Sequence, residues 1–391
     1  MLSPQAAIMV VFFVQAFAGG GLFPRIPDIQ VALDLTEGEL GLVMMGQPIG
    51  ALTSFVFASF IIERIGPKPL LAACIPLIAV ATVLLALSDS GAVAFVVMLG
   101  YGLSFALANV AMNVEADRVE AATGRRVMSR CHGMWSLGFL AASLLGAAAR
   151  GIPAPPLLHF ALVAPAVLAI AAAVIWPMRA SPPRAHTGTA RKKVFVLPRR
   201  ATFLLVGVIL SGIMVDATVR TWSVIFMRDT FAAADWVDAL TLPAFLLTLS
   251  AGRMVGDRLA DRFGPVRLAA GLLAVALAGL ALVLASQNLA VALAGFAALG
   301  IGVSVVYPLT ISAAARLGDR PASENVTSIT MVSSLIMLGV PTLMGFVAES
   351  FGIRMTFAVL LPILLLALAL TRQLSPRPVS ASGAADTAVG R

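Results

Sequence analysis

The sequence predicts an all-α membrane protein whose twelve transmembrane helices form two related six-helix bundles. The first observation is composition: 60% of the 391 residues are apolar, only 12% are charged, and the mean hydropathy is +0.98. Soluble domains carry about 25% charged residues. The second observation is that twelve apolar runs are long enough to span a bilayer, and the third is that one short motif occurs twice between such runs.

Each apolar run is predicted to be a transmembrane helix. Crossing a hydrocarbon core of ~30 Å takes roughly 20 helical residues, and the core offers no partner to exposed backbone groups. The first run ends in Ala16–Ala18 like a signal peptide, but residues 1–5 carry no Lys or Arg, so we expect a retained helix. The runs cover 6–24, 40–61, 69–88, 92–115, 132–149, 156–177, 202–227, 236–256, 267–286, 289–314, 324–347 and 353–371.

Two repeated motifs indicate that the chain is a tandem duplication. The segment SFIIERIGPKP at Ser59–Pro69 returns as DRLADRFGPVR at Asp257–Arg267, a shift of 198 positions (59 to 257), and LGYGLS at Leu99–Ser104 returns as LGIGVS at Leu299–Ser304. Such a repeat in a membrane protein points to a transporter whose site lies between the halves. We expect an N-terminal bundle at 1–178, a cytoplasmic linker at 179–200, a C-terminal bundle at 201–375 and a disordered tail at 376–391.

The basic residues predict the orientation in the membrane. If the N-terminus is cytoplasmic, 22 of the 27 Lys and Arg residues fall on the cytoplasmic side, Arg253 and Arg258 among them. Cytoplasmic loops are enriched in Lys and Arg, so both termini of this multi-pass chain are predicted to be cytoplasmic. The net charge of +8 then reflects topology and an affinity for anionic lipid, and nucleic acid is not an expected partner.

Enzymatic chemistry has no support in the sequence. Cys74 and Cys131 fall in a span and at a cytoplasmic helix start, so neither a disulfide nor a metal site is expected. The phosphate-binding pattern GxxxxGK[ST] is absent, and no nucleophile triad is recognised. We therefore expect no enzyme activity, no cofactor and no metal.

Several motifs carry a family resemblance. The repeated turn, the two six-helix halves and the basic central loop resemble the major facilitator superfamily, whose loop 2–3 signature is G-x-x-x-D-R-x-G-R-K; Ser59 and Asp257 replace its first Gly here. PRIPDIQ, AMNVEA, SRCHGMWSLG and GRMVGDRLADRFG look like a bacterial group related to sugar permeases of the fucose type. The resemblance implies the major facilitator fold, transport by alternating access and a place in the bacterial inner membrane. We expect a monomer in the lipid bilayer.

The chain departs from the patterns of related transporters at two places, and each departure bears on the predicted function. The resembled group often has an acidic residue three to four positions before the Asn of AMN, and this chain has Asn109 there. The carboxylate that the resemblance would assign to a coupling proton is therefore missing. Drug/proton antiporters of this superfamily usually carry a Gly-Pro dipeptide in the fifth transmembrane helix. The fifth run of this chain, His132–Ala149, has no Pro. This disfavours drug efflux.

Polar side chains inside the spans are the candidate binding residues, because each costs roughly 2–3 kcal/mol in lipid. Asn109 and Asn113 share one helix face, where they either bind a polar substrate or hold helices together. Asp216 lies deep in the seventh run, 202–227, one helical turn from Arg220. It is either a substrate-binding or protonatable acid, or half of a static ion pair. The predicted substrate-binding residues are Gln15, Asn109, Asn113, Asp216, Arg220, Trp222 and Tyr307.

The duplicated turns are candidate gates. Their charged side chains sit at cytoplasmic helix ends, where they either latch the inner gate or serve only as solvated topology signals. Because they recur in both halves, we favour the gate over the topology signal and exclude substrate contact. The predicted gating residues are Glu63, Arg64, Gly66, Asp261, Arg262 and Gly264.

The sequence thus favours a secondary transporter that moves a small polar, sugar-like solute by alternating access, with any proton coupling carried by Asp216. One alternative is efflux of drugs or amphipaths; aromatic residues at 7% and the mid-membrane amides speak against the wide aromatic cavity that this would need. The other is a non-transporting membrane sensor on the same fold, which the two charged copies of the turn motif disfavour.

Overall fold

The computed structural model describes residues 2–152, 154–178, 181–182, 197–231 and 233–375. Within them it contains twelve helical spans long and apolar enough to cross a membrane, which confirms the predicted class. The predicted tail at 376–391 and most of the predicted linker at 179–200 lie outside the described residues, so those boundaries stay predictions.

The N-terminal half contains six spans. Its first span is longer than predicted: α1 continues through a 3₁₀ turn into α2 and ends at Ala32 instead of residue 24. The elements are α1 (Pro4–Gly20), η1 (Phe23–Arg25), α2 (Ile26–Ala32), α3 (Glu37–Ile65), α4 (Pro67–Ala86), α5 (Gly91–Thr123), α6 (Met128–Arg150) and α7 (Pro156–Ile175). At 33 residues, α5 is ~50 Å long, so it extends beyond the hydrocarbon core.

The C-terminal half contains the other six spans, three of them in two or more pieces. The elements are α8 (Arg200–Thr230), α9 (Asp235–Asp238), α10 (Thr241–Phe263), α11 (Pro265–Ala285), α12 (Leu289–Val303), α13 (Val306–Ala315), α14 (Ala322–Phe351), α15 (Ile353–Ala358), α16 (Leu360–Leu370) and η2 (Thr371–Leu374).

Prolines explain two of the interruptions. Pro308 lies four residues after Ser304, where α12 gives way to α13, and Pro362 lies four residues after Ala358, where α15 ends. A proline cannot donate to the carbonyl four residues before it, and its ring crowds that carbonyl. The tenth span, predicted as one helix, is therefore broken near its middle.

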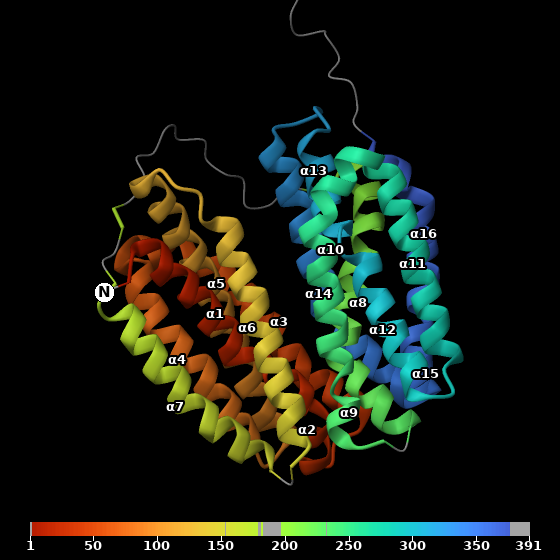
Figure 1. Cartoon of the computed structure of the whole chain (residues 1–391), viewed down its shortest axis with the longest axis horizontal. Coiled ribbons are helices and arrows are strands. Elements are labelled where there is room, and N and C mark those ends of the chain that lie inside the picture. The colour runs from red at the N-terminus through yellow and green to blue at the C-terminus, as the bar shows by residue number, and fades with distance from the viewer. Residues whose placement is uncertain (1, 153, 179–180, 183–196, 232, 376–391) are drawn as a thin grey trace, which may run out of the picture.

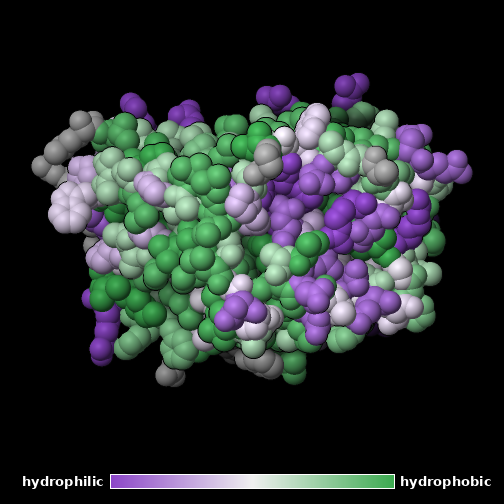
Figure 2. Space-filling view, turned by 90° about the horizontal axis from the view of Figure 1, so that it is seen from below, coloured by the Kyte–Doolittle hydropathy of each residue, from purple (hydrophilic) through white to green (hydrophobic). Residues whose placement is uncertain are grey.

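The two halves form bundles that meet at one end (Figure 1). We call the end with the α3–α4 and α10–α11 turns the basic end, and the end with α2, α9 and α15 the opposite end. Figure 1 shows the bundles in contact at the opposite end, at the bottom of the view, and diverging toward the basic end. Figure 2 looks onto the opposite end, where polar residues gather over the C-terminal half and apolar residues cover most of the N-terminal half.

Glycines from both copies of the LGYGLS motif lie at helix crossings. Gly102 of α5 packs against the backbone of Gln47 in α3, and Gly300 of α12 packs against the backbone of Phe245 in α10. A Cβ at either position would collide with a carbonyl oxygen, and small residues let transmembrane helices approach this closely. The two glycines occupy different positions of the motif, since Gly102 aligns with Gly302. The α3–α5 crossing still has its counterpart in the α10–α12 crossing, because each joins the second and fourth spans of its half.

The duplicated turns also have the same backbone conformation. Gly66 (φ +82°) joins α3 to α4, and Gly264 (φ +78°) joins α10 to α11. Each glycine is the single residue between two helices and is followed by a proline at the first helical position. A side chain at this φ is strained, so the glycine of the motif has a backbone role in both halves.

We expect Gly264→Ala to lower the stability of the purified protein by roughly 1–3 kcal/mol, because its backbone (φ +78°, ψ 151°) lies in an extended positive-φ region that only glycine adopts without strain. The control is Gly271→Ala within α11, where a Cβ meets no neighbouring atom and φ is negative; alanine should be neutral or stabilising there. Thermal unfolding in one detergent measures both variants. Equal melting temperatures for the two would contradict the backbone role.

Candidate functional site

A cavity of about 430 Å³ lies between the two halves. The N-terminal half supplies α3 and Phe23 to its wall, and the C-terminal half supplies α8, α10, α13, α14 and the end of α12. Its polar and charged lining residues are Gln47, Asp216, Arg220, Thr221, Arg253, Tyr307, Thr330, Ser333 and Ser334. The remaining wall is apolar, so the cavity has the composition of a site for a small molecule.

An ion pair on α8 lies against this cavity. Arg220 Nε donates to Asp216 Oδ2 at 2.8 Å, one helical turn apart. Asp216 is 16 residues from the start of α8 and 14 from its end, which at 1.5 Å per residue puts it near the middle of the span. The other carboxylate oxygen, Oδ1, is buried and has no hydrogen-bond partner among the described residues.

The same arginine also contacts the N-terminal half. The Arg220 guanidinium lies 4.6 Å from the ring centroid of Phe139 on α6, a cation–π contact that gains strength away from water. Arg220 therefore joins the two bundles at mid-depth.

Arg253 corrects one sequence-based assignment. It was counted among the cytoplasmic basic residues, but it lies on α10, 12 residues from Thr241 and 10 from Phe263, and lines the cavity. It is in electrostatic range of Asp216, Arg220 and Tyr307. The sequence did carry a signal, since Arg253 falls inside the predicted run 236–256.

Tyr307 also lines the cavity. It follows the break between α12 and α13, and its side chain is exposed. The structure therefore brings together three of the seven predicted binding residues, which are Asp216, Arg220 and Tyr307.

The other four predicted binding residues lie outside the cavity lining. Gln15 is fully buried; its amide donates to the Phe105 carbonyl at 3.3 Å and accepts from Trp135 Nε1 at 2.8 Å, so it joins α1, α5 and α6. Asn109 and Asn113 are half-buried on one face of α5, where Asn113 Nδ2 donates to the Asn109 carbonyl at 2.8 Å. Trp222 is fully buried.

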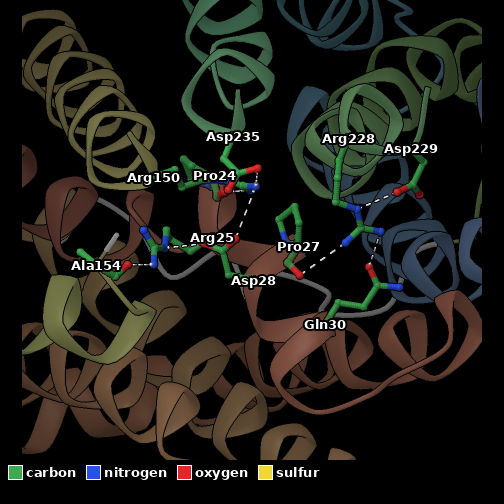
Figure 3. Close-up of polar contacts among 10 residues, drawn as sticks. All are labelled: Pro24, Arg25, Pro27, Asp28, Gln30, Arg150, Ala154, Arg228, Asp229 and Asp235. Carbon is green, nitrogen blue, oxygen red and sulfur yellow. Dashed lines mark hydrogen bonds and ion pairs between the residues drawn. The ribbon is translucent and has the colours of Figure 1, made fainter. Parts of the chain in front are cut away.

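A polar network closes the opposite end of the molecule (Figure 3). Within the N-terminal half, Arg25 Nε pairs with Asp28 Oδ2 at 2.8 Å and its Nη2 donates to the Ala154 carbonyl at 2.7 Å. Arg150, also buried, donates to the Pro24 carbonyl at 3.0 Å and lies 3.4 Å from Asp28 Oδ1. These contacts fix the end of the first span to the end of α6.

Three contacts extend this network to the C-terminal half. Arg150 lies 3.8 Å from Asp235 of α9. Arg228 of α8 donates to the Gln30 side chain at 3.2 Å (Figure 3). Glu349 of α14 accepts from the backbone N–H of Gly38 on α3 at 3.1 Å. The halves are thus joined at this end by a few polar contacts and by close packing of α3 against α14, where the Thr342 hydroxyl donates to the Gly41 carbonyl at 3.2 Å.

The predicted gating residues lie at the basic end. Glu63, Arg64, Asp261 and Arg262 are exposed, and the two arginines lie 4.5 Å and 5.3 Å from the neighbouring rings of Phe60 and Phe263. The charged residues of the two turns therefore face solvent where the bundles diverge. Among the described residues, no group of three or more His, Cys, Asp and Glu side chains is placed to hold a metal ion.

Two related six-helix bundles around a mid-membrane cavity define the transporter class. The family model of the Major Facilitator Superfamily matches residues 8–337, and the chain belongs to that family. Its members are membrane transporters and not enzymes, so the predicted fold, the membrane location and the expected lack of enzymatic activity are confirmed.

Curated relatives match along nearly the whole chain. An uncharacterised MFS-type transporter of Yersinia pestis is 23% identical over 91% of this chain and 92% of its own length. An uncharacterised transporter of Sinorhizobium fredii is 25% identical over 91% of this chain and 94% of its own. Membrane protein MosC of Rhizobium meliloti is 25% identical over 89% and 84%.

Solved structures share the fold. A bacterial homologue of the human lysosomal transporter Spinster, in an inward-facing and unoccupied conformation, superposes with a TM-score of 0.80 at 14% identity, over 97% of this chain and 98% of that one. The nucleoside transporter NupG gives a TM-score of 0.72 at 13% identity, over 96% and 100%. These likenesses show that the chain has the same fold.

Proposed function

We propose that this protein is a secondary transporter that carries a small polar solute across the membrane by alternating access. The observation that carries the proposal is the cavity of about 430 Å³ between the two halves, with Asp216, Arg220, Arg253 and Tyr307 on its wall. Charged groups inside a membrane protein mark substrate or ion pathways. Exposure of this cavity to each side in turn would move a solute without any chemical change.

The distribution of contacts supports an alternating mechanism. The opposite end is held by contacts such as Arg150–Asp235 and Arg228–Gln30, while the bundles diverge at the basic end. The first is an ion pair between a buried arginine and an exposed carboxylate, and the second is a hydrogen bond to a neutral side chain. Such contacts contribute about 0.5–3 kcal/mol each, so a few of them can close one end and still break during a cycle. We infer that the basic end is cytoplasmic, which makes this arrangement inward-facing.

The gating proposal follows from the same geometry. When the bundles close at the basic end, the acidic and basic residues of the two turns approach the partner half, and new ion pairs there would offset those lost at the opposite end. Asp261 and Glu63 are the acidic members of this proposed latch.

Asp216 is the proposed coupling residue. A carboxylate in a dry cavity favours its neutral form, whereas a neighbouring guanidinium favours the charged form. Arg220 contacts both Asp216 and the Phe139 ring of the other half, so relative motion of the halves would change the environment of the carboxylate. Binding and release of a proton could be linked to the cycle in this way. Asn109 and Asn113 remain proposed contacts for the solute on α5.

The proposed orientation predicts which engineered cysteines are accessible from outside intact cells. Asp89→Cys at the opposite end should react with a membrane-impermeant maleimide, whereas Ala122→Cys at the basic end should react only after permeabilisation. Both positions are exposed, and the native Cys74 and Cys131 are buried. Labelling of Ala122→Cys in intact cells would show that the topology is the reverse of the proposed one.

Asp261→Asn should slow turnover several-fold and leave the Kd of the solute nearly unchanged, because the residue would act on the conformational equilibrium and not on the ligand. The solute for this assay is identified by a thermal-shift screen of sugars, nucleosides, organic acids and drugs, since a ligand that binds the folded protein raises the stability of the protein. Asp319→Asn, a carboxylate of the same half that contacts Arg199, is the control. A wild-type transport rate for Asp261→Asn would exclude the latch.

Asp216→Asn should abolish accumulation of the solute against its gradient while downhill exchange stays measurable, because the variant cannot carry the proton. Proteoliposomes that contain a pH-sensitive dye report the proton flux, and Asp257→Asn, an exposed carboxylate of the same half, is the matched control. A solute-driven pH change that persists unaltered in Asp216→Asn removes this residue as the carrier. If wild-type protein gives no pH change, transport carries no proton, which favours a uniport in which Asp216 belongs to a structural pair.

A further inference from the structure

Arg253 is the least compensated charge of the cavity. Arg220 has an ion pair with Asp216 at 2.8 Å, whereas no carboxylate of the described residues forms an ion pair with Arg253. Its side chain reaches open space in the cavity wall near the middle of α10. The titratable groups in its electrostatic range are Asp216 and Tyr307 from the same half, Arg220, and His132 from α6.

The charge balance of this cavity is positive. Two guanidinium groups, Arg220 and Arg253, face one carboxylate, Asp216. An arginine keeps its charge in proteins and is costly in the interior of a membrane protein unless an anion or water accompanies it. Arg253 is exposed to the cavity, where an anionic solute would balance the excess positive charge that water alone accompanies.

We propose that the transported solute is an anion with a carboxylate group that binds the Arg253 guanidinium, and that it also carries hydroxyl groups. This inference rests on the proposed transport function and names its substrate class. The planar fork of a guanidinium presents two parallel N–H donors to a carboxylate, which makes this pair both strong and specific in orientation. The deeper Arg220 stays with Asp216.

The inference that the solute carries hydroxyl groups comes from polar atoms of other residues that line the cavity. Asp216 Oδ1 is buried and has no hydrogen-bond partner among the described residues, and the same holds for the Ser333 hydroxyl of α14. An unpaired buried polar group costs about 1–3 kcal/mol. Both residues line the cavity, so a side-chain rotation that turns either atom toward a solute hydroxyl would recover part of that cost.

Further acceptors line the same wall. The hydroxyls of Thr330 and Ser334 already donate to helix carbonyls at 3.0 Å and 2.9 Å, so each can accept a hydrogen bond from the solute but cannot donate a second one. A volume of about 430 Å³ lies within the range of small-molecule sites. A hydroxy acid of sugar size fits both the volume and this pattern of acceptors.

Matched pairs of compounds separate the carboxylate from the hydroxyls. Isothermal titration of the purified full-length protein compares D-gluconate with D-glucitol, D-glucuronate with D-glucose, and D-glycerate with glycerol. In wild-type protein at least one acid should bind about tenfold or more tightly than its neutral partner, the size of a charge-assisted bidentate interaction.

Three variants test the role of Arg253. Arg253→Gln should remove the preference for the acid by weakening its binding about tenfold or more while the neutral partner changes about twofold or less. Arg253→Lys keeps the charge but loses the fork, and should retain part of the preference. Arg258→Gln, exposed on the same helix and outside the cavity lining, should bind like wild type. The melting temperature of each variant without ligand reports its folding.

The outcomes separate this inference from the proposed function. Acids that bind no better than their neutral partners, or that do not bind, overturn the inference, and so does an unchanged acid preference in Arg253→Gln. Binding of the neutral polyols alone leaves the polar-solute transporter in place with a different substrate class. Binding of rhodamine 6G and tetraphenylphosphonium with no polar compound overturns the inference and the proposed function together.

Discussion

Charge at the middle of a membrane protein is the constraint on which the rest of this structure depends. Hydrocarbon provides neither counter-ions nor hydrogen bonds, so a guanidinium at mid-depth must face a partner side chain or an aqueous cavity. Arg220 has both Asp216 and the Phe139 ring, and Arg253 faces the cavity. The cavity between the bundles is therefore the environment that makes these charges tolerable, and the charges in turn define what the cavity can bind.

The packing within and between the bundles bears on the proposed motion of the halves. Backbones are in direct contact within each bundle, as at Gly102 against Gln47, and also between the bundles, where Gly41 of α3 packs against Pro341 of α14. The polar contacts between the bundles at the opposite end include partners that water can reach, such as the exposed Asp235 beside the buried Arg150. Two bundles that pack along one crossing and are joined by a few polar contacts favour rigid-body rocking around a fixed central site.

The sequence predicted the fold because its signals are local. Apolar runs of membrane length, the duplicated turn and the distribution of basic residues each depend on a short segment and the solvent around it. The positive φ of Gly66 and Gly264 shows why the glycine of the motif recurs. Span ends were less predictable: α1 and α2 continue to Ala32 because buried polar contacts at the opposite end, such as those of Arg25, hold the helix beyond its apolar run.

The candidate site was only partly predictable, since a polar residue in a span either lines a cavity or joins helices, and the sequence does not distinguish the two. Asp216 and Tyr307 line the cavity. Gln15, which is also polar and near mid-depth, instead forms hydrogen bonds with Phe105 and Trp135 within one bundle. Glu349, which binds the start of α3, gave no signal because its partner lies 311 positions away.

By itself, the sequence determined the membrane class, the two-fold repeat, the helical spans and the polar residues that the membrane interior must accommodate, because hydropathy and backbone preference act along the chain. The tertiary structure alone decided which of those polar residues face the cavity and which contacts join the two halves. Arg253 shows the difference: its place in a span was readable, but its position in the cavity beside Asp216 and Arg220, without an ion pair among the described residues, depends on the way α8 and α10 pack. Pairing between distant segments is a property of packing, and packing is not encoded in any one stretch of the chain.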